Sequence, residues 1–241
     1  MSALFALNPA LNRHAIRAAL TENRLVQVEN FLTPASAAAL FKLVSSQTPF
    51  GLAWAGDGQP STNMRADALK ALAPDEYARI RGVADQAAAT GQFGYIYAQY
   101  PLVEAYMHKW APGHPTEQLL EELNGGPVLD FARSVSGHSD IIKADGQITL
   151  YRPGDFLTDH DDQVTSERRR LAFVLNLAPD WKPDFGGYLN FIDARGNVAV
   201  GFMPRFNTLN LFHVPIRHNV SQVAPFAPIG RYAVTGWFLA R

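Results

Sequence analysis

The sequence predicts an α+β fold in which N-terminal helices pack on one face of a β-rich C-terminal core. Helical periodicity prevails from about residue 14 to residue 137, and short β-rich runs at intervals of roughly ten residues follow Gly146. Turn residues such as Pro153-Gly154 separate these runs, which favours a sandwich or closed barrel over a parallel sheet. We expect a single domain over residues 1–241, with a mostly helical flank carrying an early strand at 1–145 and a catalytic core at 146–241.

The composition excludes several kinds of site. The chain has 241 residues, no cysteine and a formal net charge of −1. Without cysteine it forms no disulfide, thiolate zinc site or iron–sulfur cluster, and its charge provides no drive toward nucleic acid or anionic lipid. The segment Met1–Leu20 makes a poor signal peptide, and no apolar run reaches the roughly 20 residues of a membrane span. We therefore expect a soluble cytoplasmic protein that binds neither nucleic acid nor membrane.

The individual elements follow from periodicity and end signals. Helices are predicted at Ala35–Ser46, with Thr33 as its cap, at Pro74–Thr90, at Thr116–Leu123 with Thr116 as a candidate cap, and at Val128–Val135. An early strand is predicted at Leu25–Val28. The strands of the core are predicted at Gln147–Arg152, Arg170–Leu177, Tyr188–Ile192, Val198–Phe202, Thr208–Phe212, Arg217–Val223 and Arg231–Phe238.

The run His160-Asp161-Asp162 is a candidate metal motif. Residues two apart on an extended segment point the same way, so His160 and Asp162 are expected to converge while Asp161 faces away. One imidazole and one carboxylate begin the 2-His-1-carboxylate triad of non-haem Fe(II) oxygenases, but an isolated pair is more often a solvated acidic loop. The third ligand would come from a later strand, where His213 and His218 are available.

The last predicted strand carries a lone arginine toward the core. Alternation places Arg231, Ala233, Thr235 and Trp237 on one face of it. A buried guanidinium needs an anionic partner, either an internal carboxylate or the carboxylate of a ligand. The sequence leaves these two alternatives equal for Arg231.

Residues 147–238 resemble the catalytic core of 2-oxoglutarate/Fe(II)-dependent dioxygenases, in particular the prolyl 4-hydroxylase-like branch. The matching runs are Ile148-Thr149-Leu150-Tyr151-Arg152-Pro153-Gly154-Asp155, His160-Asp161-Asp162, Arg170-Leu171-Ala172-Phe173-Val174-Leu175-Asn176-Leu177, Trp181 with Gly186-Gly187-Tyr188-Leu189, His218-Asn219-Val220 and Arg231-Tyr232-Ala233-Val234-Thr235-Gly236-Trp237-Phe238. Their order, spacing and strand context agree, which is far more specific than the metal motif alone.

The resemblance implies a double-stranded β-helix (jelly-roll) core that binds Fe(II) and uses 2-oxoglutarate and O₂, with ascorbate as an optional addition. It implies His160, Asp162 and His218 as iron ligands and Arg231 as the partner of the distal carboxylate of 2-oxoglutarate. Tyr151, and less strongly Thr235, are implied at the same cosubstrate. Arg217 and Arg205 are the alternatives to Arg231 for that role.

The resemblance further implies hydroxylation of a prolyl residue in a protein or peptide. Two alternatives stay open: the same chemistry on a free amino acid or small metabolite, and a metal-binding barrel without turnover. The sequence does not settle substrate identity, regiochemistry or oligomeric state, and residues 53–137 match no motif.

Overall fold

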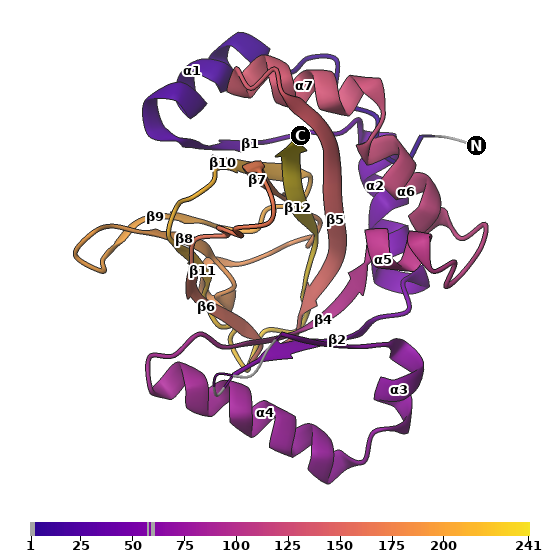
Figure 1. The fold of residues 1–241 in the computed structure, drawn as a ribbon, viewed down its shortest axis with the longest axis vertical. Coiled ribbons are helices and arrows are strands. Elements are labelled where there is room, and N and C mark those ends of the chain that lie inside the picture. The colour runs from indigo at the N-terminus through magenta and orange to yellow at the C-terminus, as the bar shows by residue number, and fades with distance from the viewer. Residues whose placement is uncertain (1–2, 57, 59–60) are drawn as a thin grey trace.

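The computed structural model describes residues 3–56, 58 and 61–241. Its strands form one sheet, and the path through it runs β1-β10-β7-β12-β5-β4-β6-β11-β8-β9. All the pairings are antiparallel, and the sheet folds over so that β6, β11 and β8 face the layer of β7, β12 and β5 across the barrel (Figure 1). A barrel of this kind places side chains of alternating positions on its inner wall.

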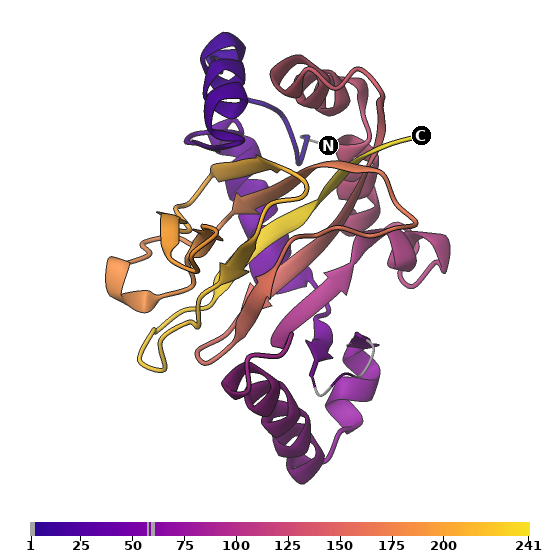
Figure 2. The ribbon, with the colours of Figure 1, turned by 60° about the vertical axis from the view of Figure 1, so that its left-hand side comes forward.

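The strands of the C-terminal half overlap those that the sequence predicts, although the first begins at Ile141 rather than Gln147 and the one expected at Arg217–Val223 covers only His218–Val220. They are β5 Ile141–Tyr151, β7 Arg169–Asn176, β8 Leu189–Ile192, β9 Val198–Phe202, β10 Thr208–His213, β11 His218–Val220 and β12 Arg231–Ala240. The early strand is β1 Leu25–Val28, as predicted. In the register of the long central pair, Arg231 lies opposite Tyr151 and Trp237 lies opposite Asp145 (Figure 2 shows these strands side by side). The inner face of this pair thus runs from one end of the barrel to the other.

Helices cover the outer face of the sheet. They are α1 Arg13–Asn23, α2 Pro34–Lys42, α3 Ala66–Ala71, α4 Pro74–Ala89, α5 Leu102–Met107, α6 Pro115–Leu123 and α7 Gly126–Ser136. In Figure 1, α2, α5 and α6 lie beside β5, whereas α4 lies along β2 and β4. Phe131, Leu40 and Val234 belong to the core between helices and sheet, and a second apolar cluster fills the barrel. Among the described residues, no helix is long and apolar enough to cross a membrane.

Part of the sheet is formed by residues for which the sequence predicts no strand. Strands β2 Gly51–Ala55, β3 Thr62–Met64 and β4 Tyr95–Pro101 lie within it, and β6 Phe156–His160 was also not predicted. Strand β4 is central, because it pairs with β2, β5 and β6. Its sequence, Tyr-Ile-Tyr-Ala-Gln-Tyr-Pro, is buried on both faces and lacks a clear period-two alternation, so a window dominated by alanine-rich helices hides it.

Two helix ends differ from the prediction. Thr33 caps α2 as expected, since its hydroxyl accepts from the backbone N–H of Ser36, but α2 gives way to a π-helical turn, Leu43–Gln47. The cap of α6 is His114 rather than Thr116, because a ring nitrogen of His114 accepts from the N–H of Thr116.

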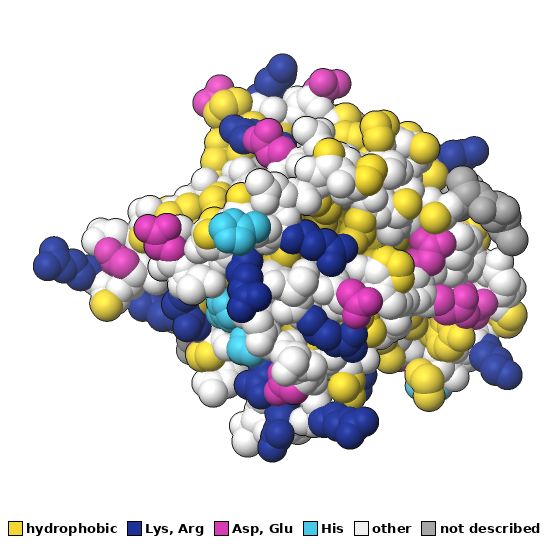
Figure 3. Space-filling view, turned by 90° about the horizontal axis from the view of Figure 1, so that it is seen from above, with side chains coloured by type: hydrophobic (Ala, Val, Ile, Leu, Met, Phe, Trp, Pro, Cys, Tyr) yellow, Lys and Arg dark blue, Asp and Glu magenta, His cyan; other side chains and the backbone are white. Residues whose placement is uncertain are grey.

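The prediction for Met1–Leu20 concerns a segment whose first two residues lie outside the described residues. On the face seen in Figure 3, basic and acidic side chains are interspersed.

Candidate functional site

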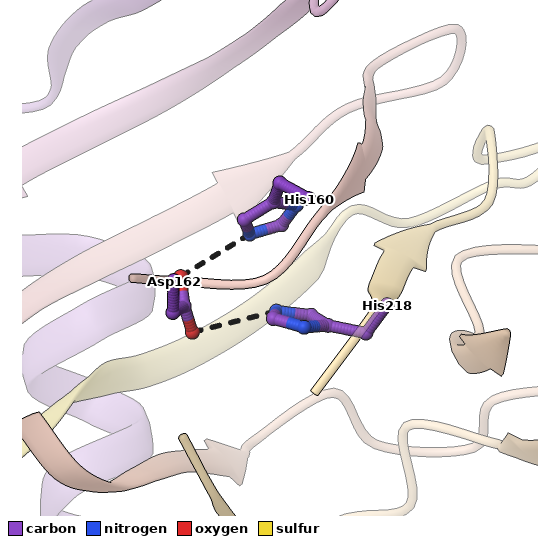
Figure 4. Close-up of side chains that lie close together, drawn as sticks. All are labelled: His160, Asp162 and His218. Carbon is purple, nitrogen blue, oxygen red and sulfur yellow. Dashed lines mark ion pairs between the residues drawn. The ribbon is translucent and has the colours of Figure 1, made fainter. Parts of the chain in front are cut away.

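His160, Asp162 and His218 converge inside the barrel (Figure 4). His160 ends β6 and His218 begins β11, and the two residues are partners in the register of these strands. Nε2 of His160 lies 3.2 Å from one carboxylate oxygen of Asp162, and Nε2 of His218 lies 3.5 Å from the other. The three donor atoms lie within 4.8 Å of one another, which is the spacing of a small metal site.

Backbone geometry brings Asp162 into this group. The convergence with His160 was expected from strand alternation, but β6 ends at His160 and Asp162 has a φ of 63°. A left-handed turn therefore aims the carboxylate, a conformation that aspartate tolerates better than most residues. The guanidinium of Arg169 donates to the carbonyl oxygen of Asp162 at 3.2 Å and stacks 3.6 Å from the ring of Trp237. Arg169 thus fixes the backbone of the turn, a role that sequence reasoning missed.

Hydrogen bonds fix the orientation of both imidazoles. Nδ1 of His160 donates to the carbonyl oxygen of Thr158 at 2.9 Å, and Nδ1 of His218 donates to that of Ile216 at 2.8 Å. Each ring therefore holds a proton on Nδ1 and, in its neutral form, presents the lone pair of Nε2 to the centre of the group. Two neutral nitrogens and one carboxylate oxygen are the donor set that suits Fe(II), so the residues present fit this metal.

The electrostatics of the group keep its carboxylate ionised. Burial alone would raise the pKa of Asp162, but the hydrogen bond from His160 and the positive charges of His218 and His160 lower that pKa to about 2. Burial and the neighbouring His160 lower the pKa of His218. Burial also acts to lower the pKa of His160, yet its contact with Asp162 prevails and raises it. A divalent cation at the centre would replace the proton that His160 attracts.

Arg231 is buried in the same cavity without an acidic partner. Its side chain is 1% exposed, Nη2 donates to the side-chain oxygen of Asn176 at 3.3 Å, and Nε has no partner among the described residues. The guanidinium carbon lies 5.2 Å from the ring centre of Tyr151. No described carboxylate forms an ion pair with Arg231, so the internal alternative left open by the sequence does not occur there. A buried cation of this kind suits an anionic ligand.

The other predicted cosubstrate residues surround Arg231. Tyr151 is buried and stacks on Tyr97 with ring centres 4.7 Å apart, and burial raises its pKa well above the usual value. Thr235 lines the cavity from the same face of β12. Asn176, which holds the guanidinium, and Tyr97, which holds the tyrosine ring, were not predicted. The signal for Asn176 was its place directly after the apolar run Leu171–Leu175, where a buried amide needs partners.

The alternative residues lie elsewhere. His213 contacts His138, with ring nitrogens 3.2 Å apart, and is not among the residues that line the cavity. Arg217 is exposed and pairs with Asp159, and Arg205 is exposed and pairs with Glu29 at 2.6 Å. These contacts separate all three from the cavity of about 460 Å³ that Arg231, Tyr151 and the metal group line.

Comparisons with known proteins agree with this arrangement. Residues 146–239 match the model of the 2OG-Fe(II) oxygenase superfamily. Over 95 residues the chain is 36% identical to prolyl 3-hydroxylase OGFOD1 of Mus musculus, and over 91 residues it is 38% identical to that of Xenopus laevis. These matches cover 36% and 35% of this chain but only 17% of each relative. The resemblance of this segment to 2-oxoglutarate/Fe(II) oxygenases of the prolyl hydroxylase-like kind, predicted from the sequence, is therefore confirmed.

Solved structures extend the likeness to the whole fold. A Pseudomonas putida prolyl-4-hydroxylase matches with a TM-score of 0.57 and 18% identity, covering 98% of both chains. A Trichoplax adhaerens prolyl hydroxylase, solved with a hypoxia inducible factor peptide fragment, matches with a TM-score of 0.60 and 18% identity over 95% of this chain and 89% of its own. The predicted α+β class with a double-stranded β-helix core and buttressing helices is confirmed.

Proposed function

We propose that the protein is an Fe(II)- and 2-oxoglutarate-dependent dioxygenase that hydroxylates a prolyl residue of a protein or peptide. The observation that carries this proposal is the cavity in which three metal-binding side chains and a buried arginine without an acidic partner occur together. The family match supports the enzyme class and the use of Fe(II), 2-oxoglutarate and O₂. The relatives that are prolyl hydroxylases by name support proline as the target.

The proposal assigns each residue a part in the reaction. Nε2 of His160, Nε2 of His218 and the carboxylate of Asp162 hold the metal from one side and leave its other side open. Bound Fe(II) with 2-oxoglutarate and O₂ supplies hydroxylation coupled to oxidative decarboxylation. Arg231 binds the carboxylate remote from the metal through its two-pronged guanidinium, and the hydroxyl of Tyr151 donates a hydrogen bond to the same cosubstrate.

The cavity walls exclude water from this chemistry. The inner cluster includes Phe191, Phe212 and Val220, and rings of Phe191 and Phe212 contact that of His218. A dry wall strengthens the attraction between Arg231 and an anion, because the effective dielectric constant is lower there than in water. A cytoplasmic location without nucleic-acid or membrane partners is part of the same proposal.

Mass spectrometry tests this function. Proline-containing peptides, free proline and a pool of small metabolites are incubated with the protein, and a gain of one oxygen atom is sought that depends on both Fe(II) and 2-oxoglutarate. We expect the gain on peptides. A gain only on free proline or another metabolite would replace the substrate while keeping the chemistry. Succinate formation with none of the three would favour another substrate class, and no succinate at all would favour a metal-binding barrel without turnover.

A further inference from the structure

A second cavity, of about 740 Å³, adjoins the metal cavity. Six residues line both cavities: Ser61, Tyr95, Tyr97, Gln147, Arg169 and Trp237. We call the second cavity the α5 groove, since Val103, Glu104 and Met107 of that helix form one wall of it. A molecule that lies in the groove can therefore reach the metal group past shared side chains.

The groove lies at the other end of the central strands from the cosubstrate arginine. On β5, Tyr151 and Asp145 are six residues apart and face the same side, so they are separated by about 20 Å along the strand. Their partners on β12 are Arg231 and Trp237. An occupant of the groove therefore does not compete with a carboxylate bound at Arg231.

The polar side chains of the groove suit an extended peptide. Gln99, Gln147 and Asn63 line it, and amide side chains both donate to and accept from a peptide backbone. Nε2 of Gln99 donates to the side-chain oxygen of Gln147, and Oε1 of Gln99 is buried without a partner among the described residues. Met107 is 71% exposed and Val103 is 37% exposed, which offers apolar contact beside these amides.

The charged side chains that line the groove differ in whether they have an ion-pair partner. Glu104 and Asp145 line it and neither forms an ion pair with a described residue. Among the described residues, the carboxylate of Asp145 accepts a hydrogen bond only from the N–H of Gly146, at 2.6 Å. Arg169, the arginine of the groove wall, is already bound by Glu167 at 2.8 Å. The groove therefore presents to its occupant two carboxylates that have no ion-pair partner among the described residues.

The partial burial of the Asp145 carboxylate makes a cationic partner more favourable. Burial is the main cause that raises its pKa, and the negative charge of Glu167 adds to that effect, while Gly146, Arg169 and Lys143 oppose it. Lys143 does not line the groove, and no ion pair joins it to Asp145. A cationic side chain of the occupant would relieve the cost of the partly buried carboxylate.

We infer that the α5 groove binds an extended peptide segment adjacent to the target proline, and that Glu104 and Asp145 select a lysine or arginine in that segment. This inference rests on the proposed function, because it names the substrate class of the same site. Charge complementarity of this kind sets specificity and the rate of association more than the total affinity.

Peptide binding without turnover tests the inference. Two fluorescein-labelled nonapeptides with a central proline are compared, identical except that lysine or glutamate stands two residues from the proline on both sides. Affinity is measured by fluorescence anisotropy with Co(II) and 2-oxoglutarate in the absence of O₂. We expect the lysine peptide to bind about tenfold more tightly, since each partly screened ion pair contributes roughly threefold.

Two variants test whether Glu104 and Asp145 cause the preference for the lysine peptide. In Glu104→Gln combined with Asp145→Asn we expect the two peptides to bind within about twofold of each other, and in Glu104→Gln alone we expect the preference to fall to about threefold. The single variant changes an unpaired surface residue and so preserves the fold. Glu22→Gln, on α1 and away from the groove, is the matched control and should keep the full preference.

The outcomes separate this inference from the proposed function. Equal binding of both peptides, no binding of either, or a lysine preference that survives the double variant would overturn the inference. Hydroxylation of both peptides at equal efficiency would also overturn it while the proposed function stands. A lysine preference that disappears in the double variant, without oxygen gain on any proline, would support the groove and count against prolyl hydroxylation.

Discussion

The two ends of the barrel differ in how their side chains are held. At the proposed cosubstrate end, Arg231 is buried and contacts Asn176 and Tyr151, which are buried too, whereas Glu104 and Met107 of the α5 groove are exposed. Rigid, buried side chains suit a ligand of fixed shape, and accessible ones suit a variable peptide. On the proposed function, we expect the end with Arg231 to serve the chemistry and the α5 groove to serve the choice of substrate.

The largest expected effect is the loss of metal binding at the cosubstrate end. Replacing His218 by Ala removes one of three donor atoms, and the metal affinity should fall by at least about 100-fold, beyond the usual loss for an outer hydrogen-bond partner. His213→Ala should leave the metal affinity close to that of the wild type, because His213 contacts His138 outside the cavity. Anaerobic calorimetry with Fe(II) or Co(II) measures both, and the opposite pattern would reassign the third ligand.

The next effect separates cosubstrate binding from metal binding. Arg231→Ala should weaken 2-oxoglutarate by roughly 10- to 150-fold, since a hydrogen bond to a charged group contributes about 1.5–3 kcal/mol. Metal affinity should stay nearly unchanged, and Arg231→Lys should recover part of the loss. Arg217→Ala and Arg205→Ala are the controls, because both arginines are exposed and already paired. A loss of 2-oxoglutarate affinity in either control, with none in Arg231→Ala, would show that the last strand does not hold the cosubstrate.

Arg231 should also lower the free energy of unfolding of the protein without 2-oxoglutarate. Arg231→Met removes a buried guanidinium without an acidic partner and keeps a side chain of similar length, so the free energy of unfolding should rise by roughly 1–4 kcal/mol. Urea denaturation without 2-oxoglutarate measures it. An unchanged or lower stability would mean that Asn176 and Tyr151 already compensate the charge.

A smaller effect is expected for Arg169, which lines both the metal cavity and the α5 groove. Arg169→Ala removes the donor to the Asp162 carbonyl and the stacking partner of Trp237, and the metal affinity should fall about tenfold. The visible spectrum of the Co(II) form should shift, because the carboxylate moves relative to the metal. Arg168→Ala, at the preceding exposed residue, is the matched control. A spectrum unaffected by Arg169→Ala would confine this residue to the groove wall.

The smallest effect concerns acid stability away from the site. Burial, the charge of His138 and the charge of Arg24 lower the pKa of His213 to about 4. The ordinary histidine pKa is about 6.5, so the unfolded chain binds the proton first as the pH falls. This contribution to stability is present above about pH 6.5 and lost toward about pH 4, with about 1 kcal/mol lost between about pH 7 and pH 5 after solvent screening. His213→Gln should flatten this slope in urea denaturation, whereas the exposed His14→Gln should not.

The same contrast explains what the sequence predicts. His218 and Arg231 lie in strands that the sequence predicts, and motif spacing alone identifies His160 and Asp162 as candidates. The strand β6 that carries His160 and the turn that carries Asp162 were not predicted, and the convergence of the three ligands depends on the pairing of β6 with β11. The location of β4 and the pairing of Arg231 with Asn176 depend on which strands become neighbours, and that depends on long-range packing. The left-handed φ of Asp162 likewise follows from the surrounding turn rather than from its own residue type.

The most direct test of the central claim uses oxygen-18 gas with a proline-containing peptide, Fe(II) and 2-oxoglutarate. We predict labelled succinate and hydroxyproline in the peptide in equal molar amounts, and neither product with His218→Ala. Succinate without hydroxyproline in any proline-containing peptide, or hydroxyproline that forms at the wild-type rate in His218→Ala, would contradict the account.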